Sequence, residues 1–588
     1  MKLFIKKALL AGLIVAGFAS CKKVLDVKPG TELAADQMYR DVYDANAAVM
    51  GIYGKFMELS DRYIILNELR ADLMEFTNNA DENLRQINNH TVTAGNPYAN
   101  PRPFYQLIVN CNDVLKNFRI MKATNKLSEA DYNQRYSDIG ALRSFLYLQL
   151  GIHYGEVPYV TEALENLNDV SDPSRFPKLA LPVLLDSLVN FTEALPFKDI
   201  YPPNVSTGIS TSLNMTLDAY QTSRFFVNKK CLLGDLNLWK GNYRKAATYY
   251  REVMDLATTG TQGENYYSQY KMAWSGNANL YVTYTRGGDA SSLTYTDGWG
   301  SMFSATDERF NREMIWALPY DSKFGPENPL IKLFSPTGGQ YLVRPSAEII
   351  RYWDEQQQRP VTTTGAAGIP YDARKLLSTS TVGGQPVITK FISNYINVLT
   401  GLPINILTKN GRWFLYRQAH MHLRFAEAAN RDGFPRLAYA IVNHSIGEAY
   451  DNTTITDKTT LQNTFDLPDP YKFDARNGVI PNFRGPWYRN IGIRKRANLV
   501  NFPLTATNAA DSISQIEVGI IQEQALETAF EGTRWADLLR VAIRRNDPAF
   551  IADKVYEKLR KNGASAGAAN QARAKLLARD WFLPFNWN

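Results

Sequence analysis

Hydrophobic and polar positions repeat with helical spacing along much of the chain. Apolar side chains recur every three or four residues at about 34–59, 103–122 and 128–155, which is the spacing of one face of an α-helix. The third segment begins at Ser128, a favoured helix N-cap residue, and stops at Gly155. The pattern predicts a mainly α-helical protein.

Two segments combine helices into pairs. In 229–257, Gly234 lies on a first helix, and a tight turn at Gly241 leads into a second. The segment 415–446 repeats this arrangement, with its turn at Gly433. Small residues at the crossing and an aromatic residue after the turn are typical of tetratricopeptide pairs. Such pairs bury their apolar faces by stacking, so we expect a tetratricopeptide-like scaffold in a single body.

A long irregular insertion interrupts the helices at about 258–410. Gly, Ser, Thr and Pro become frequent there, aromatic side chains crowd its first part, and short strands are expected at 281–284 and 313–318. Two other irregular stretches lie at 78–103, expected as a long loop, and at 470–510. Loop-rich insertions of this length often carry the functional residues of a protein.

The N-terminus has the pattern of a lipoprotein signal. Three lysines precede an apolar run at 8–18, and small residues then lead to Cys21. This resembles a bacterial lipobox, although Phe18 replaces the usual Leu, Val or Ile. We expect removal of residues 1–20, lipidation of Cys21 and an extended tether over 21–33; the alternative is a plain secreted protein. No other run of about 18 apolar residues could span a bilayer.

Charge and cysteine content exclude several classes of protein. The formal charge of +7 includes three signal-peptide lysines, so the mature chain carries +4, with both signs mixed. Nucleic-acid binding would need a clustered basic face. Cys111 and Cys231 each lie in an apolar helical pattern, which favours free buried thiols, although a disulfide between them stays open.

No enzymatic or metal-binding motif stands out. Neither a phosphate-binding loop nor a Gly-x-Ser-x-Gly nucleophile elbow is present. His420 and His422 lie two residues apart on a predicted helix and therefore point away from each other, so we expect no metal and no cofactor. One acidic and basic series follows helical spacing, which favours structural ion pairs over a glycosidase-type carboxylate pair. It comprises Glu523, Glu527, Glu531, Arg534, Asp537 and Arg540.

Several segments, in order along the chain, resemble the SusD/RagB family of surface lipoproteins from Bacteroidetes. Each has the residue pattern of a family helix, turn or strand. They are the helix at Tyr105–Leu115 with Asn110 and Asn112, the helix and turn at 139–148 and 154–159, the middle region at 344–346 and 371–374, the helix at 523–540 and the closing strand at 581–588.

The resemblance implies a fold, a function and a partner. It implies one SusD-like body over 34–588, with a tetratricopeptide-like helical scaffold and an irregular ligand-binding face. Members of this family capture nutrient, most often an oligosaccharide, and deliver it to a SusC-like TonB-dependent transporter in the outer membrane. We therefore expect a non-enzymatic glycan-binding lipoprotein at the cell surface. The alternatives are peptide capture and, from another class, a surface glycoside hydrolase.

Candidate ligand-binding residues come from exposed aromatic and polar positions. Trp299 lies between Gly298 and Gly300 among polar neighbours, which predicts an exposed ring able to stack on a sugar. Trp316, by contrast, lies in a continuous apolar strand and is expected in the core. Trp274 and Tyr295 lie in a similar polar loop context, and Tyr98 lies in the loop where the family usually presents an aromatic residue. Further candidates for hydrogen bonding or stacking are Asp72, Asn100 and Tyr341.

Overall fold

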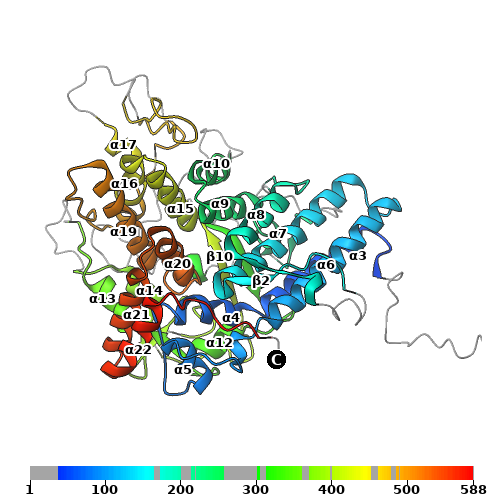
Figure 1. Cartoon of the computed structure of the whole chain (residues 1–588), viewed down its shortest axis with the longest axis horizontal. Coiled ribbons are helices and arrows are strands. Elements are labelled where there is room, and N and C mark those ends of the chain that lie inside the picture. The colour runs from blue at the N-terminus through cyan, green and yellow to red at the C-terminus, as the bar shows by residue number, and fades with distance from the viewer. Residues whose placement is uncertain are drawn as a thin grey trace, which may run out of the picture.

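The computed structural model confirms the mainly helical fold class, with strands that pair only in twos (Figure 1). It describes residues 38–164, 173–199, 201, 213–218, 220–256, 301–304, 313–359, 370–397, 400–451, 461–477, 485–488 and 490–586. None of the helices in these ranges is both long and apolar enough to cross a membrane.

The first half of the chain supplies nine of the described helices. They are α3 (Val42–Met57), α4 (Ser60–Ile64), the π-helix η1 (Ile65–Leu69), α5 (Glu82–Asn89), α6 (Arg102–Ala123), α7 (Glu129–Tyr154), α8 (Leu181–Glu193), α9 (Lys229–Lys240) and α10 (Tyr243–Met254). Helices α3, α6 and α7 pack side by side at one end of the molecule (Figure 1).

The second half adds shorter helices and then a long C-terminal group. They are α11 (Ser301–Ser304), α12 (Pro329–Phe334), α13 (Ala347–Asp354), α14 (Arg374–Ser378), α15 (Gln418–Arg431), α16 (Pro435–Asn443), α17 (Ile446–Ala449), α18 (Ile493–Arg496), α19 (Ala509–Glu527), α20 (Arg534–Arg545), α21 (Ala549–Lys561) and α22 (Ala566–Leu577). Helices α21 and α22 pack together at the opposite end from α3 (Figure 1).

The predicted helix starts and helix pairs are present. The Ser128 side chain accepts a hydrogen bond from the Asp131 backbone N–H at the start of α7, and α7 ends at Tyr154, before Gly155. Helices α9 and α10 pack against each other, as do α15 and α16. At the first crossing, a Cβ on Gly234 would lie 2.3 Å from the Tyr250 ring, so the helices approach too closely for a larger residue.

The strands in the described part of the chain form antiparallel pairs. The longest pair, β6 (Met314–Tyr320) with β10 (Gly411–Arg417), is completely buried. The others are β1 (Met74–Phe76) with β7 (Val343–Pro345), β2 (Glu156–Pro158) with β3 (Lys178–Ala180), β4 (Thr216–Leu217) with β5 (Tyr220–Gln221) and β8 (Thr379–Val382) with β9 (Gln385–Ile388).

The core is one continuous cluster of buried hydrophobic side chains that extends from Tyr39 to Leu583. Trp316 on β6 belongs to it, as expected, and its indole N–H donates to the Phe225 carbonyl at 2.9 Å. Cys111 and Cys231 are both buried and free, which confirms that they do not pair. Burial raises the pKa of both thiols, so they remain protonated and inert.

Three local predictions were wrong. The stretch expected as a long loop contains α5, which begins where Asp81 accepts from the Leu84 backbone N–H. The helix expected over 523–540 is two helices, because Phe530 and Gly532 adopt left-handed conformations (φ +71° and +84°) between α19 and α20. Residues 581–586 form no strand, although the Leu583 backbone N–H donates to the His153 carbonyl.

Candidate ligand-binding site

Four predicted functional residues lie outside the described residues. They are Trp274, Tyr295 and Trp299 in the aromatic-rich insertion and Cys21 at the lipobox. Their roles in ligand binding and lipidation therefore stay predictions from the sequence.

Tyr98 and Asn100 lie together in the loop that leads into α6. The Arg62 guanidinium fixes this loop by donating to the carbonyl oxygens of Pro97 and Tyr98, each at 2.7 Å. The Asn100 side-chain oxygen accepts from the Arg102 backbone N–H at 2.8 Å. Tyr98 is half-buried, with its ring against the core, so it presents only part of its surface to a ligand.

Asp72 is a structural residue, which corrects the expectation that it contacts a ligand. Its carboxylate is fully buried and accepts from both Nε and Nη2 of Arg534, at 2.6 and 2.7 Å. Burial alone would raise the pKa of Asp72, but the Arg534 guanidinium holds it at about 2. Tyr341 is also mostly buried, and its hydroxyl donates to the Pro386 carbonyl at 2.6 Å.

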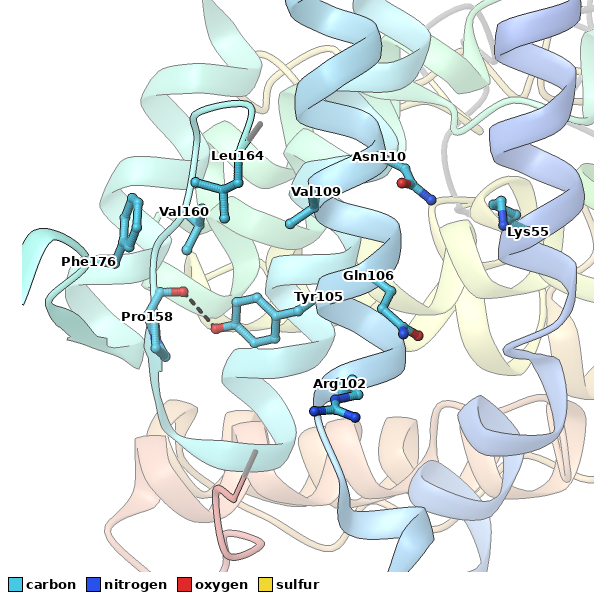
Figure 2. A pocket seen from close by; sticks show the side chains of 10 residues that line it. All are labelled: Lys55, Arg102, Tyr105, Gln106, Val109, Asn110, Pro158, Val160, Leu164 and Phe176. Atoms are coloured by element: carbon cyan, nitrogen blue, oxygen red, sulfur yellow. Dashed lines mark hydrogen bonds between the residues drawn. The ribbon is translucent and has the colours of Figure 1, made fainter. Parts of the chain in front are cut away.

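A groove lies between α3, α6 and the chain that follows α7 (Figure 2). Its volume is about 810 Å³, within the range of small-molecule binding sites in proteins. Polar side chains lie on the side of α3 and α6, and apolar side chains lie on the other side. The lining residues are Lys55, Arg102, Tyr105, Gln106, Val109, Asn110, Pro158, Val160, Leu164 and Phe176.

One wall is a row of polar side chains on α6. Arg102, Gln106 and Asn110 follow one another every four residues, and residues at this spacing share one face of a helix, about 6 Å apart along its axis. Lys55 reaches toward the same space from α3 (Figure 2). The row offers amide donors and acceptors between two cationic groups.

The opposite wall is apolar and closed at its base by a tyrosine. Val160, Leu164 and Phe176 line this side (Figure 2). The Tyr105 hydroxyl donates to the Pro158 carbonyl at 2.7 Å. Burial raises the pKa of Tyr105 well above its ordinary value, so the hydroxyl stays protonated and engaged in this bond.

Buried polar residues hold the apolar wall in place. The Asn112 amide donates to the Val160 carbonyl at 3.0 Å and to the Glu162 carbonyl at 3.1 Å. The Asn112 side-chain oxygen in turn accepts from Arg143 at 2.7 Å, and the Tyr147 hydroxyl donates to the Val160 carbonyl at 2.7 Å. These bonds preform the groove, which reduces the ordering cost of binding.

The described lining of the groove offers groups for binding a ligand. These described side chains include no carboxylate, histidine or cysteine, and neither Lys55 nor Arg102 pairs with a carboxylate among the described residues. General acid–base hydrolysis of a glycoside needs two carboxyl groups across the bond. The described side chains therefore suit a neutral or anionic ligand with many hydroxyl groups.

The acidic series at the C-terminus is buried in an ion-pair network. Glu527, for example, bonds to the guanidinium groups of Arg374, Arg417 and Arg496, each at 2.6–2.7 Å. Five carboxylates and five cations contribute. They are Asp372, Glu313, Glu523, Glu527 and Glu531 with Arg374, Arg417, Arg494, Arg496 and Lys390. The structural interpretation holds, although most partners come from other elements.

Metal binding gains no support from the histidines. His420 is buried, and its Nδ1 accepts from the Arg417 backbone N–H. Burial lowers the pKa of His420 to about 3, against the opposing effect of the Glu531 carboxylate. Among the residues that the structure describes, no three His, Cys, Asp or Glu side chains converge in a way that could hold a metal ion.

The sequence analysis missed Lys55, Arg102 and Gln106 and assigned no binding role to Asn110. The four-residue spacing of the polar row on α6 is visible in the sequence. It does not by itself indicate a binding site, because exposed polar residues on an amphipathic helix ordinarily face only water. The contribution of α3 depends on how two distant helices pack, which no local pattern reveals.

Comparisons with known proteins define the fold. Neither a scan of protein-family models nor a search of curated proteins finds a match. Solved structures do match: a SusD superfamily protein from Bacteroides vulgatus has a TM-score of 0.56 at 15% identity, over 90% of this chain and 94% of that one.

Two further matches carry a description of what they bind. Surface glycan-binding protein A from Bacteroides uniformis has a TM-score of 0.53 at 16% identity, over 90% of this chain and 95% of that one. A laminarin-binding SusD-like protein has a TM-score of 0.51 at 16% identity, again over 90% and 95%. The chain therefore has the SusD-like fold that its motifs indicate.

Proposed function

We propose that this chain with the SusD-like fold is a surface lipoprotein that binds a glycan in the α6 groove. One observation carries the proposal: a row of amide and cationic side chains faces an apolar wall across a preformed hollow. The comparisons support it, because two proteins of the same fold are described as binding a glycan or laminarin.

The two walls match the two kinds of surface on a sugar. Ring hydroxyls need both donors and acceptors, and the carboxamides of Gln106 and Asn110 supply both. The apolar face of a pyranose can lie against Leu164 and Phe176, and an aromatic contact of this kind contributes about 1 kcal/mol. Micromolar binding corresponds to about 8 kcal/mol, so hydrogen bonds and burial of the sugar must supply most of it. Binding of this strength suits a protein that must release its ligand.

Binding without turnover is the proposed activity. Among the residues that the structure describes, no acidic side chain lines the groove, and the carboxylates of the C-terminal network are buried and paired with cations. A surface glycoside hydrolase would need an accessible pair.

The finer proposal adds an anchor and a partner. Lipidation of Cys21 would hold the protein at the outer membrane, and a SusC-like TonB-dependent transporter would receive the glycan. Support comes from the lipobox pattern before Cys21 and from the family resemblance.

A panel of glycans tests the proposal. Purified protein without residues 1–20 is run through native gels that contain laminarin, other neutral glycans, acidic glycans or no glycan, and each glycan is then analysed for cleavage products. We expect retardation by at least one glycan with no products. Retardation by none, together with binding of oligopeptides, would favour peptide capture, and released products would show an enzyme.

A further inference from the structure

A second hollow lies away from the α6 groove, between the β1–β7 pair and the turn of the β8–β9 hairpin. Its volume is about 200 Å³, below that of sites for drug-sized ligands and compatible with one sugar ring. Its lining residues are Thr77, Asn78, Asn79, Tyr341, Arg344, Gly384, Gln385 and Pro386. We call it the Arg344 pocket.

The walls of the Arg344 pocket are fixed by hydrogen bonds. Thr77 donates its backbone N–H to the Leu342 carbonyl at 2.9 Å and its hydroxyl to the Tyr341 carbonyl. Tyr341 has a left-handed backbone (φ +49°), which is uncommon for a bulky residue and costs about 1 kcal/mol or more. The hydrogen bond from the Tyr341 hydroxyl to the Pro386 carbonyl links this strained residue to β9.

Arg344 is the charged group of the pocket, and no described residue bonds to its guanidinium. Its side chain is half-buried, and its Nε is fully buried without a hydrogen-bond partner. A buried donor without a partner costs about 1–3 kcal/mol, and more when it is charged. Because this Nε is sealed from solvent, an acceptor from outside the chain would bond to the two terminal Nη groups of Arg344, for which no described residue provides a partner.

The neighbouring carboxylate does not fill this role. Glu75 lies opposite Arg344 in the β1–β7 register, yet no ion pair within 4.0 Å joins them. Oε1 of Glu75 instead accepts from the Asn88 amide at 3.2 Å, and its Oε2 is buried without a hydrogen-bond partner. Burial raises the pKa of Glu75, against the lowering effects of Lys558 and Arg344.

The remaining polar groups suit a sugar. Asn78, Asn79 and Gln385 are exposed carboxamides, able to donate to and accept from ring hydroxyls. None of the described residues that line the pocket carries a carboxylate. An acidic group on the ligand would therefore meet no repulsion, and a carboxylate matches the planar fork of an arginine.

We propose that the Arg344 pocket binds an acidic sugar residue whose ring carboxylate pairs with the Arg344 guanidinium. This rests on the proposed function, because it names the class of glycan that the protein takes. The carboxamides of Asn78, Asn79 and Gln385 bond to the hydroxyls of the same sugar.

Binding of single sugars tests this independently of any glycan linkage. The dissociation constants of D-glucuronate, D-galacturonate, D-glucose and D-galactose are measured by NMR titration of the protein without residues 1–20. We expect at least one uronate to bind about tenfold more tightly than its neutral counterpart. Arg344→Gln should remove that difference, and Arg573→Gln, on the exposed face of α22, should preserve it.

A second variant tests the proposal in case Arg344→Gln does not fold. Gln385→Glu adds a carboxylate at an exposed position, so it should weaken binding of the uronate several-fold more than binding of its neutral counterpart, with an unchanged melting temperature. The proposal is overturned if wild type binds no uronate or does not prefer it, or if Arg344→Gln changes only the melting temperature, as a partner of Glu75 alone would. The glycan panel is unaffected by these outcomes: a protein retarded by a neutral glycan but indifferent to uronates loses this inference and keeps the proposed function.

Discussion

At the residue scale, the centre of this protein is unusually ionic. Arg417 illustrates the arrangement: it is fully buried and bonds to Glu313, Glu527 and Glu531 at 2.7–2.9 Å. Buried charges are tolerated only when each has a partner of opposite sign and good geometry. The network joins β6, β10, α14, α18 and α19, so its charges position elements that lie far apart in the sequence.

Removing one carboxylate from the network should destabilise the protein without affecting the groove. Glu531→Ala removes a carboxylate that bonds to both Lys390 and Arg417, each at 2.8 Å. We expect a loss of about 3–5 kcal/mol in the free energy of unfolding, measured by denaturant titration, with glycan affinity of the folded protein nearly unchanged. Asp553→Ala breaks an exposed pair with Arg573 and should cost less than about 1 kcal/mol. Equal effects of the two changes would contradict the structural role.

A buried carboxylate at the start of α20 should give stability a distinct pH dependence. Glu68 accepts from the backbone N–H groups of Gly532 and Thr533 at 2.8 and 3.0 Å. Burial raises the pKa of Glu68 from 4.5 to about 7, despite the lowering effect of these N–H groups. The folded state therefore binds a proton more readily than the unfolded state between about pH 4.5 and 7, so its contribution to stability is lost as pH rises through 7.

The matching variant is Glu68→Gln, which keeps the acceptor and does not titrate. The melting temperature of wild type minus that of the variant should increase when the pH is lowered from 8 to 5. A difference that stays constant over this interval would show that Glu68 has an ordinary pKa.

Single residues were the hardest feature to predict from the sequence. The pairing of Asp72 with Arg534 joins positions 462 apart in the chain, and no local pattern contains that information. The local sequence around a polar residue is the same whether its side chain faces a ligand or a buried arginine. Trp299 remains a prediction, because it lies outside the described residues.

At the element scale, close approach of helices explains where small residues occur. Gly234 on α9 faces Tyr250 on α10, and Tyr250 is fully buried with its hydroxyl on Asp235 at 2.6 Å. The ring therefore cannot move aside at low cost.

Two glycine substitutions should change stability in opposite directions. Gly234→Ala places a methyl group 2.3 Å from the Tyr250 ring and should cost about 1–3 kcal/mol by overpacking. Gly54→Ala in α3 meets no atom within 4 Å and should stabilise by about 0.5–1 kcal/mol, because alanine favours the helix. Thermal unfolding measures both, and a stabilising Gly234→Ala would contradict the packing of α9 on α10.

Elements with strong local signals were predicted well. Helix α7 has an N-cap and a terminal glycine in its sequence, and the α9–α10 pair has its turn and small residues. The break between α19 and α20 was missed, because Phe530 adopts a left-handed conformation that its residue type does not favour. At Phe530, tertiary contacts therefore outweigh the local conformational preference of the residue.

At the scale of the whole molecule, motif order along the chain correctly indicated the fold, although no single motif decides it. Arg143 and Tyr147, which carry the resemblance near α7, hold the apolar wall of the groove. Motifs therefore report the scaffold, whereas the groove itself arises from the packing of α3 against α6.

The anchor should be separable from the body. Cys21→Ala removes the lipidation site, while the core begins at Tyr39, so the variant should fold normally. In cells that lack the transporter, it should leave the outer-membrane fraction for the soluble fraction, as judged by immunoblotting. Retention of the variant with the membrane would contradict lipid anchoring through this residue.

The central claim is that the α6 groove is the glycan-binding surface, and one measurement tests it most directly. Calorimetric titration with a glycan that retards the protein compares wild type with the double variant Gln106→Ala/Asn110→Ala. Loss of hydrogen bonds from two carboxamides should weaken binding about tenfold or more, with an unchanged melting temperature. The matched control, Asn570→Ala/Gln571→Ala on exposed α22, should bind like wild type. Equal affinities of the groove variant and wild type would contradict the account.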